Sequence, residues 1–483
     1  MSSLRPSSPD PSGPAGPLRI STQWLRPRLL TEGLPTDPWA LAGFAATAAV
    51  VGFLTGVVAA TFQLLLEDAT HGREWLGRHT HGVWWGLPVA MVVCGAATAT
   101  AAWLVHRIEP HAEGSGIPRV EAVVDGRTPP TRPRVLPVKY AGGLLSIGVA
   151  GLTLGPEGPL VQMGGSIAAI VGNAARRSAT DVRILVAGGA AAGLATAFNA
   201  PIAGGVFILE QLLKRFDPRT TIATLVASAS GFAGAHLVLG PRPPIFQVGQ
   251  LAEPRLSYVP WVVAVGLLAG VFGVAYNRSI LFGLHLVDTS RWPALVRSIA
   301  IGAVIGGIGW LAPTLIGGSE PLTERALLGR ETLLVALGLF AIRFFLGVLS
   351  YAACTPGGLF GTMLLLGGQV GLVVAMVAHR MVGDSAPQTA GLVLVGMAAL
   401  FTAVVRTPVT GLILVTELSA SAVMLPPMLG ACAVAMLVAT ALRTKPLYEL
   451  LTLRSAAAAA ENEAERGAED EGMPTPRAAR AQD

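Results

Sequence analysis

The chain has 483 residues, of which 52% are hydrophobic and 13% charged, with a formal net charge of +5. A typical soluble domain carries about a quarter charged residues, so too few charges are present here to cover a water-facing surface. The composition therefore excludes an ordinary soluble protein. The small basic excess forms no continuous stripe, which argues against nucleic-acid binding.

The predicted elements begin after a tail rich in Pro, Ser and Gly, residues 1–37, which we expect to be disordered and cytoplasmic. No charged residue lies between Asp37 and Glu67. Further uncharged runs lie at about 80–106, 184–209, 220–241, 256–277, 298–319, 344–378, 385–405 and 418–442. A bilayer core needs roughly 20 apolar residues in a helix. The sequence therefore predicts an all-α, polytopic membrane domain over 38–453 and a disordered tail over 454–483.

The apolar segments contain many of the chain's 58 glycines and 35 prolines. Inside a membrane these residues indicate closely packed helices and helices broken at depth, as in channels and transporters. The three cysteines, Cys94, Cys354 and Cys432, stand singly in apolar runs. They have no paired or metal-ligand spacing, so we expect them to be small buried side chains.

An internal repeat relates the two halves of the chain. Gly155–Gly165 aligns with Gly358–Gly368 at an offset of 203, and Pro201–Glu210 aligns with Pro408–Glu417 at an offset of 207. Such repeats often form inverted halves whose interrupted helices meet near the bilayer midplane. We expect the halves to span about 38–240 and 256–450. The two glutamates that end the second pair could lie at a subunit contact or at the cytoplasmic face.

Three Gly-rich segments, Glu113–Pro118, Gly155–Pro159 and Gly357–Gly361, each precede a predicted helix. Helix N-termini carry unpaired N–H groups and roughly half a positive charge. Several such ends aimed at one point bind an anion without a buried lysine or arginine. The ion is then held weakly enough to leave again, which conduction requires.

These segments carry a resemblance to the CLC family of chloride channels and chloride/proton antiporters. Gly114–Pro118 matches the first CLC signature, and Gly155–Pro159 resembles the second. Gly358–Thr362 resembles the third, and Lys445–Tyr448 resembles the segment that carries the family's ion-contacting tyrosine. The four motifs occur in order, and the resemblance spans about 38–453.

The resemblance implies a CLC-type fold, a homodimer with one pore in each subunit, and chloride as the transported ion. It implies no catalytic role, no metal and no cofactor, and its further partners are membrane lipid and, in the antiport alternative, protons. Glu157 would be the gate, its carboxylate competing with chloride until a proton neutralises it. The anion-binding residues implied are Ser115, Gly116, Ile117, Leu359, Phe360 and Tyr448.

Other interpretations of these residues stay open. Ser115 could cap the following helix, and Tyr448 could be an interfacial anchor. Glu157 could be a structural charge at a helix N-terminus. Arg343, within an apolar run, is either a functional charge or lies near the aqueous end of its helix.

Three positions depart from the family pattern: Pro156 replaces Lys or Arg, Thr362 replaces Pro, and Gln211 replaces the inner glutamate of proton-coupled members. Gln211 cannot carry a proton, although Glu210 beside it could belong to a proton path. The sequence therefore predicts chloride transport with weak or no proton coupling, and strict chloride/proton antiport is the alternative. A membrane enzyme would need clustered polar groups, yet none of the eight histidines pairs with a carboxylate at catalytic or metal spacing.

Overall fold

The computed structural model describes residues 38–214 and 216–457. The predicted N-terminal tail and residues 458–483 lie outside the described residues. Within them the regular elements are helices, apart from one isolated antiparallel bridge between Gly155 and Gly358.

Sixteen α-helices are described, eight before residue 240 and eight after it. The first eight are α1 (Pro38–Thr80), α2 (Gly86–Arg107), α3 (Ile117–Val124), α4 (Val135–Gly143), α5 (Glu157–Ala174), α6 (Ala179–Phe198), α7 (Pro201–Phe207) and α8 (Pro218–Leu239). The second eight are α9 (Val259–Thr289), α10 (Ala294–Leu311), α11 (Glu320–Leu327), α12 (Leu333–Tyr351), α13 (Phe360–Val382), α14 (Thr389–Val405), α15 (Pro408–Ser419) and α16 (Leu425–Ala441).

Shorter helical pieces extend or connect these helices. Two π-helical turns continue α4 and α7, namely η3 (Leu144–Val149) and η4 (Ile208–Leu213). Single 3-10 turns are η2 (Pro110–Ala112), η5 (Leu256–Tyr258), η6 (Pro313–Leu315) and η7 (Gly383–Ser385). A final helical segment covers residues 447–457.

Eight of the described helices are long and apolar enough to cross a membrane, which confirms the predicted polytopic architecture. Most of them expose a broad apolar side, as expected where lipid is the solvent. Two differ: α6 is 94% buried and α13 is 78% buried over its most apolar window. These two helices therefore form the interior of the protein. The three cysteines are buried and free, as predicted.

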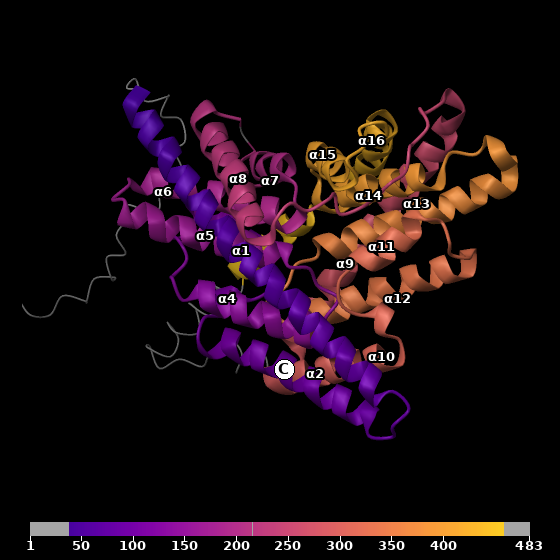
Figure 1. Ribbon diagram of the computed structural model, residues 1–483, viewed down its shortest axis with the longest axis horizontal. Coiled ribbons are helices and arrows are strands. Elements are labelled where there is room, and N and C mark those ends of the chain that lie inside the picture. The colour runs from indigo at the N-terminus through magenta and orange to yellow at the C-terminus, as the bar shows by residue number, and fades with distance from the viewer. Residues whose placement is uncertain (1–37, 215, 458–483) are drawn as a thin grey trace, which may run out of the picture.

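The two halves repeat the same packing, as the sequence repeat predicts. In Figure 1 the N-terminal half lies mainly to the left and the C-terminal half to the right. Helix α1 packs against α8 as α9 packs against α16, and α5 packs against α6 as α13 packs against α14. The α2 and α10 helices pack together and join the halves.

Glycine pairs set the closest of these crossings. A Cβ atom on Gly164 would overlap the carbonyl oxygen of Gly189, and the reverse is also true. Gly367 and Gly396 meet in the same way at the crossing of α13 and α14. These positions are related by the offsets of the sequence repeat, so the repeat preserves backbone-to-backbone contact. Close contact of this kind is how helices associate strongly in lipid.

Candidate anion site

The three Gly-rich segments meet at the centre of the molecule. Gly155 and Gly358 exchange backbone hydrogen bonds of 2.9 and 2.8 Å. The amide of Gly357 donates to the carbonyl of Gly114 over 3.1 Å. The starts of α3, α5 and α13 are therefore joined by main-chain contacts, although Gly114 and Gly357 lie 243 residues apart in the sequence. The positive ends of three interrupted helices converge, as an anion site requires.

Ser115 lies at this junction and is 1% exposed. Its hydroxyl accepts a hydrogen bond from the amide of Ile117 over 3.4 Å, so it has a capping role at α3. Tyr351, at the end of α12, lies beside this junction, with its hydroxyl 3.0 Å from the position of a Cβ atom on Gly114. Gly158 packs so closely that a Cβ there would lie 2.8 Å from the Ser115 Cα atom. The first turn of α5 therefore rests directly on Ser115.

Glu157 is the first residue of α5 and is 4% exposed. Its side chain folds back so closely that a Cβ on Gly155 would overlap its carboxylate. The carboxylate lies against Gly361 in the first turn of α13, where a Cβ atom would be 3.2 Å from the Glu157 Oε1 atom. Its Oε2 atom has no hydrogen-bond partner among the described residues. Glu157 thus places a carboxylate where the convergent helix ends favour negative charge.

Tyr448 enters the same region from the C-terminal segment. It is fully buried, and its hydroxyl has no hydrogen-bond partner among the described residues. Its ring centroid lies 6.1 Å from that of Phe360 and 6.4 Å from that of Phe207. Burial among these rings argues against an interfacial anchor. A hydroxyl donor held in an apolar cage is well suited to a desolvated anion.

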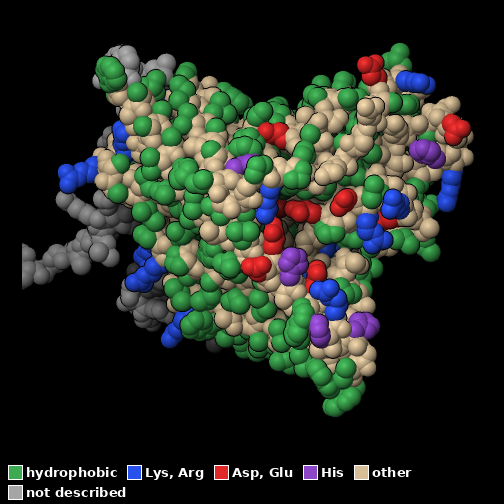
Figure 2. Space-filling model, in the orientation of Figure 1, with side chains coloured by type: hydrophobic (Ala, Val, Ile, Leu, Met, Phe, Trp, Pro, Cys, Tyr) green, Lys and Arg blue, Asp and Glu red, His purple; other side chains and the backbone are tan. Residues whose placement is uncertain are grey.

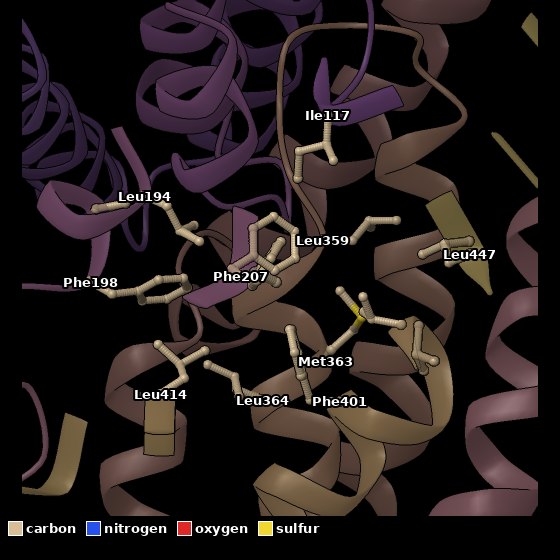
Figure 3. Packing of buried hydrophobic residues seen from close by; sticks show 14 of the residues in the cluster. Ile117, Leu194, Phe198, Phe207, Leu359, Met363, Leu364, Phe401, Leu414 and Leu447 are labelled. Carbon is tan, nitrogen blue, oxygen red and sulfur yellow. The ribbon is translucent and has the colours of Figure 1, made fainter. Parts of the chain in front are cut away.

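Figure 3 shows how the segments that carry the predicted anion-binding residues come together. The side chains of Ile117, Leu359 and Leu447 surround one region with Phe207. Ile117 belongs to α3, Leu359 directly precedes α13, and Leu447 belongs to the C-terminal helical segment. Gly116, with φ of 77°, begins α3 in the left-handed region that glycine adopts readily.

Lys139 supports the site, although its role was not predicted from the sequence. Its side chain is fully buried in α4, and Nζ donates to the carbonyls of Ala112, Glu113 and Gly114 at 3.0, 3.4 and 2.6 Å. These bonds hold the loop that leads into Ser115. The available signal was a single lysine in an otherwise apolar segment, which marks a functional or positioning charge.

Glu210 and Glu417 cap each other's helices. Glu210 accepts from the amides of Val409 and Thr410 at 3.1 and 2.7 Å, at the start of α15. Glu417 accepts from the amides of Ile202 and Ala203 at 3.0 and 2.6 Å, at the start of α7. Each carboxylate therefore satisfies N–H groups that a helix start leaves unpaired. The exchange is the structural counterpart of the second sequence repeat.

The two residues predicted for a proton path, Glu210 and Gln211, have different surroundings. Gln211 is buried within the π-helical turn η4, whereas both carboxylate oxygens of its neighbour Glu210 are engaged in capping α15. Thr362 donates its hydroxyl to the carbonyl of Thr153 over 3.0 Å, a contact that proline could not make. Pro156 occupies the position before α5, where its missing N–H costs no helical bond.

Arg343 has a structural role. It is 1% exposed, and its guanidinium donates to the carbonyls of residues 315, 317 and 318 and to the Ser319 hydroxyl, over 2.9–3.2 Å. It therefore lies in the interior of the protein, away from the aqueous end of α12. Its charge fixes the loop that leads into α11.

Comparison with known proteins decides the family. Residues 95–440 match the family model described as "Voltage gated chloride channel". The chain belongs to the CLC family. It is 32% identical over 439 residues to the H(+)/Cl(-) exchange transporter ClcA of Salmonella paratyphi A, covering 88% of this chain and 91% of that one. It is 34% identical over 420 residues to ClcA of Vibrio parahaemolyticus, covering 84% and 89%.

Solved CLC structures have the same fold. A slow cyanobacterial Cl-/H+ antiporter superposes with a TM-score of 0.81 at 31% identity, covering 86% of this chain and 98% of that one. A CLC-type fluoride/proton antiporter gives 0.70 at 20% identity, covering 83% and 96%, which is a likeness of fold alone. This CLC chain is therefore a multi-pass membrane protein that transports anions, as predicted from the four motifs.

Proposed function

We propose that this CLC protein exchanges chloride for protons across a membrane, with Glu157 as the shared gate. Chloride occupies the point where the α3, α5 and α13 N-termini converge. The hydroxyls of Ser115 and Tyr448 and the amides of Leu359 and Phe360 bind it there. Gly116 and Ile117 form the first turn that supports the site on the α3 side.

The position of the Glu157 carboxylate is the observation that carries this proposal. It lies at the start of α13, packed against Gly361, within the positive field that attracts chloride. An ionised carboxylate competes with chloride for that field. A protonated carboxyl loses most of this attraction and releases the position to chloride. One group therefore links proton binding to chloride entry.

The names of the relatives favour exchange over the weak coupling expected from Gln211. The ClcA relatives are named H(+)/Cl(-) exchange transporters, and the cyanobacterial neighbour is named an antiporter. Gln211 does not bind a proton at physiological pH, and Glu210 is held as a helix cap. Protons must then reach Glu157 from the inner side through water or through another carboxyl.

Liposomes that contain the purified protein test this function. An outward chloride gradient should drive protons inward against their own gradient. Glu157→Gln should keep passive chloride flux, lose proton movement and show a flat pH profile. Wild-type chloride flux without uphill proton movement would contradict exchange and restore the weakly coupled alternative. A wild-type pH profile in Glu157→Gln would show that Glu157 is not the gate.

The homodimer expected from the family stays a prediction. If each subunit holds a complete site, a mixed dimer of wild-type and Glu157→Gln subunits should transport as the sum of two independent pores. Single-molecule flux traces with two discrete levels would support this arrangement.

A further inference from the structure

A deep cavity of about 1100 Å³ opens on the gate side of the protein. Its lining combines α1, α8, η6 and α11 with Pro156, the residue next to the gate. Figure 2 shows acidic, basic and histidine side chains gathered around a hollow in the middle of one face, between apolar flanks. The cavity lies along the C-terminal half of α1, at the opposite end of this helix from Pro38, which directly follows the segment predicted to be cytoplasmic. We call it the outer vestibule.

Glu320 is an acidic residue of the vestibule, and its neighbour in the sequence, Ser319, lies beside the gate. It is the first residue of α11 and lines the cavity. A Cβ atom on Gly361 would lie 3.2 Å from the Glu157 Oε1 atom and 3.6 Å from the Ser319 hydroxyl, so both side chains meet over Gly361. Glu320 follows Ser319 directly, and its charge acts on the Glu157 carboxyl.

The loop before Glu320 is held rigidly. Arg343 donates five hydrogen bonds to residues 315–319, including one of 2.9 Å to the Ser319 hydroxyl. The amide of Gly317 also donates to the carbonyl of Gly151 over 2.8 Å. Glu320 therefore starts α11 from a fixed point beside the gate. A fixed position suits a group that exchanges protons with one partner.

The charges facing Glu320 leave it able to change protonation state. Glu67 on α1 forms a 3.1 Å ion pair with Arg242, and both act on Glu320. Glu320 is exposed at the vestibule, yet the protein around its carboxyl still removes part of its water and raises its pKa; Glu67 raises the pKa further and Arg242 lowers it. Further charged and titratable groups that line the vestibule are His71, Arg73, Glu74, Arg78, His81, His236 and Arg325. Of these, Arg73 donates to the backbone carbonyls of residues 147 and 148.

We propose that Glu320 is the outer proton-exchange group for Glu157. The inference rests on the proposed exchange function. A proton leaves the Glu157 carboxyl, which becomes a carboxylate, and binds the Glu320 carboxylate, which becomes a carboxylic acid; water in the vestibule then takes it. The reverse sequence loads the gate from outside. No bond other than the O–H bonds changes, and no electrons are transferred.

Proton flux in liposomes tests the role of Glu320, with outside pH varied at a fixed chloride gradient. Glu320→Gln should slow proton-coupled exchange about tenfold near neutral outside pH. This is less than a positioned general acid or base contributes in catalysis, because water still reaches Glu157. Glu324→Gln is the matched control, since Glu324 is exposed one turn further along α11 and does not line the vestibule. It should behave as wild type. Glu320→His should restore exchange with a displaced pH profile, which a purely structural role would not produce.

Combining Glu320→Gln with Glu157→Gln distinguishes a failure of the Glu320 role from a failure of the proposed exchange function. In the Glu157→Gln background Glu320→Gln should leave chloride flux unchanged, because no proton transfer is then required. Faster chloride flux there would show that Glu320 acts as an electrostatic barrier to chloride, and would overturn the inference. Wild-type exchange rates and pH profile in Glu320→Gln would also overturn it while leaving the proposed function intact. A wild type that moves no protons would overturn both.

Discussion

Replacing Tyr448 with Phe removes one hydroxyl and leaves the ring that packs against Phe207 and Phe360. That hydroxyl is buried without a protein hydrogen-bond partner among the described residues. A hydrogen bond to a charged partner contributes about 1.5–3 kcal/mol. At about 1.4 kcal/mol for each factor of ten, Tyr448→Phe should weaken chloride binding about 10- to 150-fold.

The same substitution should act differently on stability. An unpaired buried hydroxyl costs about 1–3 kcal/mol, so in chloride-free buffer the Phe variant should unfold at the same temperature as wild type or slightly higher. Calorimetric titration with chloride in detergent and thermal unfolding without chloride measure the two effects. Tyr140→Phe is the control, because its hydroxyl bonds to Thr61 over 3.2 Å away from the site. Unchanged chloride affinity in Tyr448→Phe would refute the assigned role of the hydroxyl.

Three further outcomes follow from the packing and the proton path. Glu417→Gln weakens the cap on the first amides of α7 and should lower the free energy of unfolding by about 1–2 kcal/mol. Thermal unfolding measures this, with the exposed variant Glu253→Gln as the control. Equal melting temperatures of the two variants would contradict the capping role. Gly164→Val forces α5 away from α6 and should cost at least the roughly 1–3 kcal/mol of an overpacked core; folding yield at wild-type level would show that the crossing can relax. Gln211→Glu supplies a proton-binding group and should increase the number of protons moved per chloride in liposomes, whereas an unchanged ratio would mean that another group limits proton entry.

The sequence predicted the membrane fold well because its signals are local and additive. Long uncharged runs such as the one that follows Asp37 leave no choice but a helix in lipid. The glycine pair Gly164 and Gly189 recurs as Gly367 and Gly396. This signal can also be read position by position, because each close helix crossing needs only two residues without side chains.

The support around the site was harder to predict. Lys139 and Arg343 were visible as isolated charges, but nothing in the local sequence says which carbonyls they bind. Their partners are loops 25–28 residues away. The mutual capping by Glu210 and Glu417 needs both halves in place, because each carboxylate binds a helix about 200 residues distant. The vestibule that exposes Glu320 is formed by helices from both halves, so it has no sequence signature.

Bromide is a close chemical substitute for chloride and can be located by its anomalous scattering, so a crystal soaked in bromide tests the central claim directly. We expect an anomalous peak within hydrogen-bonding distance of both the Ser115 and Tyr448 hydroxyls, beside the amides of Leu359 and Phe360. In Tyr448→Phe crystals the same peak should be weaker. A bromide peak found only in the outer vestibule, or hydroxyls of Ser115 and Tyr448 that face different cavities, would contradict a central anion site built from the three helix N-termini.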